Sequence, residues 1–236
     1  LVRQYSRGPL AIAHNGNLVN AYRVRTDLES AGSIFNGTSD TEVIAHLIAR
    51  SQQGLLEDRI SDALQEVRGA YSLLFLGKSV LIGVRDPNGF RPLWLGRLGE
   101  AYILASETCA FDVVEAQPIR EIEPGEMIVI TDTKKPPKSF QVLPTADQLS
   151  QCIFEHIYLA RPDSMIFNEL ANGPRREFGR QLARECPVDA DIVIPVPDSA
   201  TIAALGFSEE AKIPFEMGLY RNPYVGRTFM NPSQEI

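Results

Sequence analysis

Apolar residues recur with the period of an α-helix in the first third of the chain. A run over 9–14 predicts a strand, and Asn17 is expected to cap a helix that ends near residue 31 at Gly32. Ser39 and Glu42 have the spacing of a capping box, which predicts a second helix. One face of that helix carries Val43, Ile44, Leu47 and Ile48. A third helix is predicted over 57–67, with Ile60, Ala63, Leu64 and Val67 turned inward.

From Gly69 the pattern changes to short runs of aliphatic and aromatic residues separated by Gly, Asn and Pro. These runs predict antiparallel strands joined by tight turns. The strands are expected at 70–76, 80–85, 93–96, 102–105, 126–131 and 140–143, with a short helix at 108–114. Asp86 to Gly89 has the composition of a turn. Helices that flank antiparallel strands indicate a layered α+β sandwich.

Beyond about residue 146 the pattern changes again. An amphipathic helix is predicted over 175–186, and 191–196 reads as a continuous apolar strand of a sheet buried on both faces. A helix begins near Ser199, directly after the polar Pro197-Asp198. Strand, polar turn and helix are the start of a doubly wound unit, whose ligands bind at the carboxyl end of the strand.

Composition narrows the function classes. The 236 residues are 44% hydrophobic and 22% charged, which is typical of a globular protein. A net charge of −7 argues against a general nucleic-acid surface, and no apolar run has the length of a membrane span. Three widely separated cysteines argue against a disulfide framework, so a reducing cytoplasm is expected. A first residue other than Met and a polar end lead us to expect an internal piece of a longer protein.

Asn15-Gly16 has two interpretations. Asn-Gly is a strong signal for a type I′ hairpin turn, although 18–28 does not read as a returning strand. Alternatively, the Asn15 amide and the Gly16 backbone N–H are two donors that can stabilise a developing oxyanion in acyl transfer.

Further motifs follow in a specific order. Asn36-Gly-Thr-Ser-Asp-Thr-Glu42, Arg85-Asp-Pro-Asn-Gly-Phe-Arg-Pro92 and Ala105-Ser-Glu-Thr-Cys-Ala110 come first. Gln151-Cys-Ile-Phe-Glu-His-Ile-Tyr-Leu-Ala-Arg-Pro-Asp-Ser164, Val196-Pro-Asp-Ser199 and Tyr224-Val-Gly-Arg-Thr-Phe229 come later. In this order the motifs resemble the glutamine phosphoribosylpyrophosphate amidotransferase family, also called amidophosphoribosyltransferases. The resemblance implies an N-terminal-nucleophile hydrolase-like αββα sandwich over 1–148, lacking its first strands. The start of an α/β type I phosphoribosyltransferase domain is implied over 149–236.

The resemblance also implies the reaction. Glutamine is hydrolysed in the first domain, and its ammonia displaces pyrophosphate from phosphoribosyl pyrophosphate, which gives 5-phosphoribosylamine in the first step of purine synthesis. Asn15 and Gly16 match the oxyanion-hole pair, and Asp40 matches the residue that binds the α-amino group of glutamine. Gly37 stands where the family more often has Thr. The nucleophilic N-terminal Cys of the family has no match, so we expect the chain as it stands to be inactive.

Four positions in the second half carry implied ligand contacts. Cys152 is either a buried apolar residue or a ligand of a 4Fe–4S cluster, and the sequence leaves both readings open. Ser199 is either an ordinary helix cap or a contact to Mg²⁺ on phosphoribosyl pyrophosphate. Tyr224, Gly226 and Arg227 match a lid over that substrate, although their composition alone predicts a loop.

The implied partners are glutamine, phosphoribosyl pyrophosphate and inhibitory purine nucleotides, with a homo-oligomeric assembly and no nucleic acid or membrane. Two alternatives remain at this stage. Another class II amidotransferase is disfavoured because 151–229 does not match the synthase domains of those enzymes. A paralogue without a nucleophile, which senses phosphoribosyl pyrophosphate or a nucleotide, is also compatible with the sequence.

Overall fold

The structure is a computed structural model and describes residues 1–222 and 224. The chain forms two compact units. Unit 1 is Leu1–Glu155 with Ser164–Glu169, and unit 2 is His156–Asp163 with the described residues from Leu170 onward. The division into a glutaminase domain over 1–148 and a phosphoribosyltransferase domain over 149–236 remains a prediction. None of the helices in the described part of the chain combines the length and apolar character that a bilayer crossing requires.

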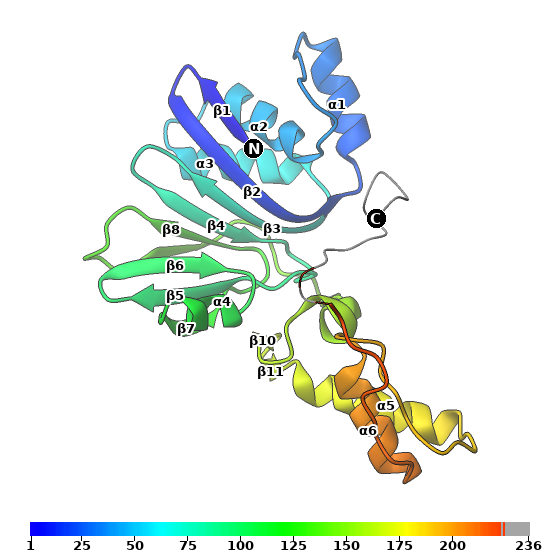
Figure 1. Cartoon of the computed structure of the whole chain (residues 1–236). Helices are drawn as coiled ribbons and strands as arrows, with labels where there is room; N and C mark the ends of the chain where they lie inside the picture. The colour runs from blue at the N-terminus through cyan, green and yellow to red at the C-terminus, as the bar shows by residue number, and fades with distance from the viewer. Residues whose placement is uncertain (223, 225–236) are drawn as a thin grey trace. The chain divides into compact units, whose positions relative to one another are not determined.

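Unit 1 contains two antiparallel sheets (Figure 1). The larger sheet has the order β1 (Val2–Tyr5), β2 (Gly8–Leu18), β3 (Gly69–Leu76), β4 (Leu81–Arg85), β8 (Glu126–Ile130) and β9 (Lys138–Gln141). The smaller sheet has the order β6 (Ala101–Ala105), β5 (Trp94–Leu98) and β7 (Gln117–Glu121). The helices are α1 (Ala21–Ser30), α2 (Thr41–Arg50), α3 (Leu56–Glu66) and α4 (Cys109–Val113). The short strands β10 (Met165–Ile166) and β11 (Glu169–Leu170) pair with each other.

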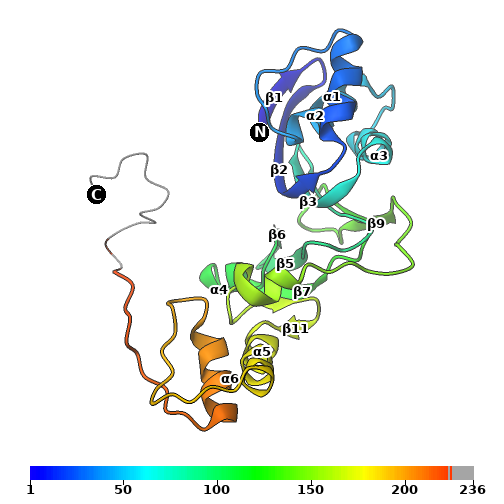
Figure 2. The same ribbon diagram turned by 90° about the vertical axis from the view of Figure 1, so that its right-hand side faces the viewer.

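Alternation along the central strands explains the layers. In β3, Leu73 and Phe75 belong to the core shared with α1–α3, whereas Leu74 packs in a second cluster between the two sheets. Successive side chains of a strand point to opposite faces, so the larger sheet is buried on both. Figures 1 and 2 show α1–α3 beside the strands of this sheet, and α4 adds Phe111 to a third cluster on the smaller sheet. The predicted αββα sandwich is confirmed.

Strand β2 is longer than the sequence predicts. Asn15 pairs with Ser72 and Leu18 with Gly69 of β3, so Asn15-Gly16 lies inside a strand. The hairpin interpretation of Asn15-Gly16 is therefore wrong, and so is the expected cap at Asn17, since α1 begins at Ala21. Pairing with β3 supplies the backbone partners that a local turn or cap would otherwise provide.

The predicted capping box is also wrong, although α2 begins close to the expected position. The Glu42 carboxylate accepts hydrogen bonds from the backbone N–H groups of Asn36 (3.1 Å) and Gly37 (3.0 Å) and pairs with Arg3 (2.7 Å). Burial raises the pKa of Glu42, but these partners outweigh burial and hold the pKa below its usual value. The Glu42 carboxylate therefore binds Arg3 and the 36–37 backbone instead of capping the helix, and it holds the loop before α2 in place.

Unit 2 is built around α5 (Asn172–Glu185) and α6 (Thr201–Ala211), preceded by the π-helix Glu155–Leu159. A parallel bridge joins Val193 to Phe215, so the segments before and after α6 run in the same direction. The prediction that 191–196 is buried on both faces is wrong for this structure. Ile192, Ile194 and Val196 are exposed, because among the described residues this segment makes a single bridge and no sheet covers it.

Candidate active site

The first two predicted site residues lie in the second half of β2. Asn15 is paired with Ser72, and its side chain reaches two loops of the smaller sheet. Its Nδ2 donates to Ser106 Oγ, which lies 3.3 Å away just after β6. Its Oδ1 accepts from Arg91, with distances of 3.2 Å to Nε and 2.8 Å to Nη2. The amide is therefore held from both ends.

Gly16 is required by the backbone. Its φ of +153° lies where side chains are disfavoured, and an added Cβ would collide with the Ala70 carbonyl and come within 2.9 Å of His14 Nε2. Any other residue would separate β2 from β3 at this point. Gly16 is also exposed, so the backbone next to the Asn15 amide remains open to solvent.

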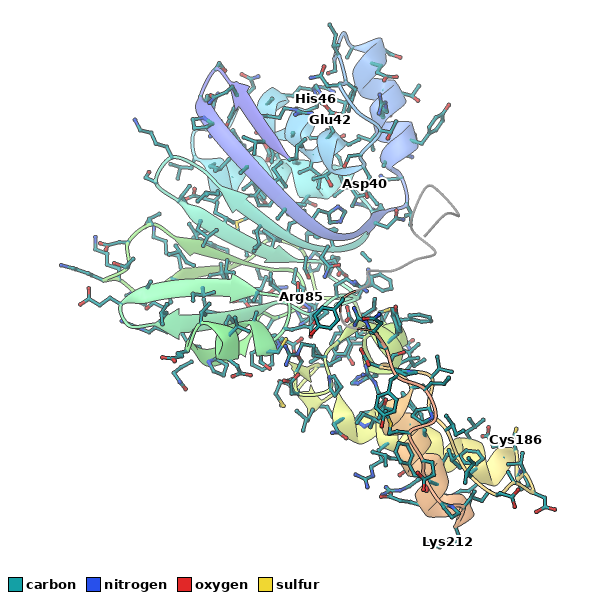
Figure 3. All side chains as sticks on the ribbon, in the orientation of Figure 1. Asp40, Glu42, His46, Arg85, Cys186 and Lys212 are labelled. Atoms are coloured by element: carbon teal, nitrogen blue, oxygen red, sulfur yellow. The ribbon has the colours of Figure 1, made fainter. Side chains whose placement is uncertain are left out.

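Asp40 is held against the same strand from the helix side, beside the start of α2 (Figure 3). Its Oδ2 accepts the backbone N–H of Leu18 at 3.0 Å, and its Oδ1 lies 3.6 Å from His14 Nδ1. His14 Nδ1 is also 3.1 Å from Thr41 Oγ1. Asp40 thus contacts the strand that carries Asn15 and Gly16, through Leu18 and His14 of that strand.

A buried turn places Arg91. Asp86 is fully buried, and its carboxylate accepts the N–H groups of Tyr71 (3.3 Å), Asn88 (2.9 Å) and Phe90 (3.1 Å). Burial raises the pKa of Asp86, against the opposing effect of these N–H groups. The predicted turn over Asp86 to Gly89 is confirmed by the Gly89 N–H, which donates to the Asp86 carbonyl at 3.1 Å.

The buried side chain of Arg85 holds this turn through hydrogen bonds to backbone carbonyls. Its guanidinium donates to the carbonyls of Arg91 (2.9 Å), Ile122 (2.7 Å) and Gly89 (3.2 Å) and pairs with Glu121 at 3.1 Å. Ser72 Oγ adds a hydrogen bond to the Arg91 carbonyl at 3.3 Å. Asp86 and Arg85 together fix the backbone of the loop that points Arg91 at Asn15.

Arg91 has no role in the sequence-based site, although it lies inside the Arg85–Pro92 motif. The motif alone identifies a turn, while the contact to Asn15 joins positions 76 residues apart. Arg91 Nη1 also pairs with Glu155 Oε1 at 3.0 Å, and the Glu155 side chain is 3% exposed. Burial raises the pKa of Glu155, and Arg91 opposes that shift.

Of the other predicted residues, Cys152 belongs to unit 1, and Ser199 and Tyr224 belong to unit 2. Cys152 is half-buried, and its N–H donates to the Phe90 carbonyl at 3.1 Å. Ser199 precedes α6 in unit 2, and Tyr224 is exposed. Gly226 and Arg227, together with most of the predicted lid, fall outside the described residues.

The described residues contain no complete metal site of His, Cys, Asp or Glu side chains. A 4Fe–4S cluster takes four thiolate ligands. No three His, Cys, Asp or Glu side chains within residues 1–222 and 224 are arranged to hold a metal ion. Cys152 as a cluster ligand and Ser199 as a magnesium contact therefore remain predictions.

Residues 2–113 match the model of a family described as the glutamine amidotransferase domain. Across all 236 residues the chain is 48% identical to amidophosphoribosyltransferase of Bacillus subtilis (strain 168), of which it covers 49%. It is 49% identical to amidophosphoribosyltransferase 2, chloroplastic, of Arabidopsis thaliana, of which it covers 42%. The chain is a homologue of the amidophosphoribosyltransferases. The family predicted from the motifs is thereby confirmed, and the chain spans about half the length of these relatives or less.

Solved structures agree with this relationship. A structure described as the allosteric regulatory enzyme of purine biosynthesis superposes with a TM-score of 0.89 at 48% identity. The match covers 99% of this chain and 50% of that one. A glutamine phosphoribosylpyrophosphate amidotransferase from B. subtilis, complexed with ADP and GMP, gives a TM-score of 0.88 at 48% identity, with 99% and 51% covered. Asn15, Gly16, Asp40 and Arg91 all lie in the amidotransferase match. The catalytic roles assigned to the first three remain predictions.

Proposed function

We propose that this chain is part of a glutamine-dependent amidophosphoribosyltransferase. Such an enzyme converts glutamine, water and phosphoribosyl pyrophosphate into glutamate, pyrophosphate and 5-phosphoribosylamine. The observation that carries the proposal is the 48% identity to an amidophosphoribosyltransferase across all 236 residues, which extends through unit 2. Similarity restricted to the amidotransferase domain would leave other class II amidotransferases equally open.

The geometry around Asn15 supports the first half-reaction. Attack on the glutamine amide carbon puts negative charge on its oxygen. That charge is best stabilised by donors that are already oriented. Asn15 Nδ2 and the Gly16 backbone are adjacent on a strand paired with β3. Asp40, held beside Leu18 and His14, would bind the α-amino group through its negative charge.

Unit 2 supports the second half-reaction. Its parallel bridge across α6 has the connectivity of a βαβ unit, which agrees with the start of a phosphoribosyltransferase domain. Mg²⁺ is the proposed companion ion, since it commonly binds protein-held substrate phosphates. Tyr224, Gly226 and Arg227 remain the proposed lid. Purine nucleotides are proposed inhibitors, since a relative is described in complex with ADP and GMP.

Three further assignments rest on the sequence alone. The cytoplasm is the proposed compartment because three widely spaced cysteines suit a reducing environment. A homo-oligomer is proposed from the family resemblance. Cys152 stays a proposed 4Fe–4S ligand, tested by iron and sulfide analysis of anaerobically purified wild type and Cys152→Ser.

The test of the function is an assay of the protein expressed from its full open reading frame. Glutamate and pyrophosphate should form in equal amounts when glutamine, phosphoribosyl pyrophosphate and Mg²⁺ are supplied together. Ammonia should replace glutamine in the release of pyrophosphate. Release of glutamate with no dependence of pyrophosphate on either nitrogen source would contradict the proposal.

A further inference from the structure

We propose that Arg91 is a positioning residue that fixes the amide orientation of Asn15, and that Glu155 holds Arg91 in place. This inference rests on the proposed function, because it concerns the oxyanion donor of the glutamine half-reaction. It assigns a task to two residues that act through their contacts with Asn15 and with each other.

The orientation follows from donor and acceptor chemistry. Arginine carries N–H donors and no acceptor, so the Asn15 atom that faces Arg91 must be the carbonyl oxygen. Nε and Nη2 both donate to Asn15 Oδ1, at 3.2 and 2.8 Å. Turning the amide by 180° would place its NH₂ group against two donors. Arg91 therefore directs Asn15 Nδ2 away from itself, which a neighbour that can also accept a hydrogen bond, such as a hydroxyl, would not enforce.

Glu155 occupies the remaining side of the guanidinium. Its Oε1 lies 3.0 Å from Arg91 Nη1, and this carboxylate is 3% exposed while the Arg91 side chain is 18% exposed. A buried carboxylate without a cation is costly, so the two charges retain each other. Two hydrogen bonds from Nε and Nη2 to Asn15 and an ion pair of Nη1 with Glu155 together restrict the rotation of the guanidinium plane.

Nδ2 itself has a replaceable partner. In this structure it donates to Ser106 Oγ at 3.3 Å, which is long for a hydrogen bond from an amide. An oxyanion is a stronger acceptor than a hydroxyl, so it can displace Ser106 without any rotation of the amide. The donor is oriented before the reaction begins, which is the condition under which such donors contribute most to catalysis.

The test compares variants of the protein expressed from its full open reading frame, each assayed with glutamine and with ammonia. Arg91→Ala should lower kcat for glutamine by up to about 100-fold, as small losses of alignment can. The KM for glutamine and the ammonia-dependent rate should each change by less than about threefold, since the guanidinium of Arg91 is engaged by Asn15 and Glu155. Arg91→Lys should recover part of the loss, because lysine donates to Oδ1 but lacks the fork. Arg97→Ala, an exposed arginine of β5, is the matched control.

A double variant separates positioning from general structural support. If Arg91 acts through Asn15, then Asn15→Ala/Arg91→Ala should be within about threefold of Asn15→Ala alone. Glu155→Gln should give a smaller loss, again in kcat for glutamine. The proposal is overturned if Arg91→Ala retains wild-type kcat, if the two losses multiply, or if the glutamine- and ammonia-dependent rates fall together. Wild-type protein that fails to use glutamine would overturn the proposed function, and this inference with it.

Discussion

The two units of this chain are stabilised in different ways. Unit 1 has apolar clusters on both faces of its larger sheet, with Leu73 and Phe75 fully buried on the helix side. In unit 2, no comparable cluster forms among the described residues, and large side chains such as Leu182 and Ile192 are exposed. Its helices are instead joined by a close backbone approach and by charged side chains.

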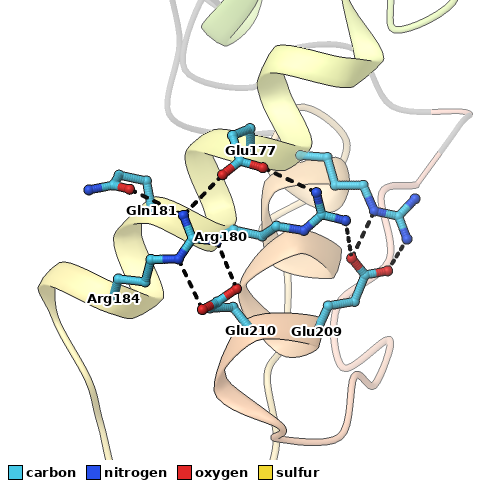
Figure 4. Close-up of polar contacts among 7 residues, drawn as sticks. Glu177, Arg180, Gln181, Arg184, Glu209 and Glu210 are labelled. Carbon is cyan, nitrogen blue, oxygen red and sulfur yellow. Dashed lines mark hydrogen bonds and ion pairs between the residues drawn. The ribbon is translucent and has the colours of Figure 1, made fainter.

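The close approach in unit 2 depends on two glycines. A Cβ on Gly179 of α5 would collide with the carbonyl of Ala203, and one on Gly206 of α6 with that of Arg176. Around this crossing, arginines of α5 pair with glutamates of α5 and α6 (Figure 4). The pairs are Arg176–Glu209, Arg180–Glu209, Arg180–Glu177, Arg184–Glu177 and Arg184–Glu210.

This difference matches the tasks proposed for the two units. Aligning Asn15 with an oxyanion requires a rigid frame, which the buried sheet and the internally bonded 86–92 loop provide. Ion pairs at a surface contribute less to stability than a buried apolar core does, and their contribution changes with salt and pH. Unit 1 should therefore resist perturbations that loosen unit 2.

The largest stability effect is expected from the core of unit 1. Phe75→Ala removes a fully buried ring from β3 and should lower the free energy of unfolding by about 3–5 kcal/mol. Phe178→Ala, at a residue of α5 that is 37% exposed, should lower the free energy of unfolding by less than about 1 kcal/mol. Urea denaturation of both variants provides the comparison. Equal losses would show that the two units do not differ as described.

A smaller effect is expected at the helix crossing of unit 2. Gly179→Ala should destabilise α5 and α6 by about 1–3 kcal/mol, since the helices must move apart. Gly173→Ala in the same helix meets no atom within 4 Å and should be neutral or slightly stabilising. Hydrogen exchange read by mass spectrometry should show faster exchange in unit 2 peptides only. Faster exchange throughout unit 1 would contradict the separate stabilisation of the units.

The smallest effect is expected on the stability of α5 and α6 at low pH. Hydrogen bonds from Arg176 and Arg180 lower the pKa of Glu209 from an ordinary value of 4.5 to about 2. A depressed pKa contributes stability above about pH 4.5, and this contribution is lost as the pH falls toward 2. Glu209→Gln should flatten the pH dependence of exchange in α5 and α6 over that window. Glu216→Gln carries the same charge change outside the cluster and should not. Identical pH profiles of exchange for the two variants would show that the arginine–glutamate contacts do not stabilise α5 and α6.

Periodicity predicted the elements whose stability comes from burying one face. The helix with Val43 and Leu47 inward and the antiparallel strands of the sandwich formed as expected, because burial dictates both the pattern and the packing. Strand β7 (Gln117–Glu121) was not predicted. Its first three residues are exposed, so its sequence shows no alternation of buried and exposed positions. It forms by pairing with β5.

Predictions that relied on hydrogen bonds between neighbouring residues failed where residues distant in the sequence bind the same side chain. Glu42 has the spacing of a capping residue, yet it binds Arg3 and the 36–37 backbone. The same limit applies to the site. Asn15 and Gly16 were selected by their donors. Folding brings Arg91 to Asn15 across 76 positions, and Glu155 to Arg91 across 64. The sequence identified the groups proposed to face a substrate and missed the groups that contact them.

In the proposed function, unit 1 uses Asn15 to activate glutamine for a synthesis that otherwise runs on ammonia. The most direct measurement is the ratio of glutamine- to ammonia-dependent pyrophosphate release in Asn15→Ala, made in the protein from its full open reading frame. Loss of an oxyanion donor should lower the glutamine-dependent rate by about 10²–10³-fold. The ammonia-dependent rate should stay within about twofold of wild type, because Asn15 lies in the amidotransferase match. An unchanged ratio would contradict the account.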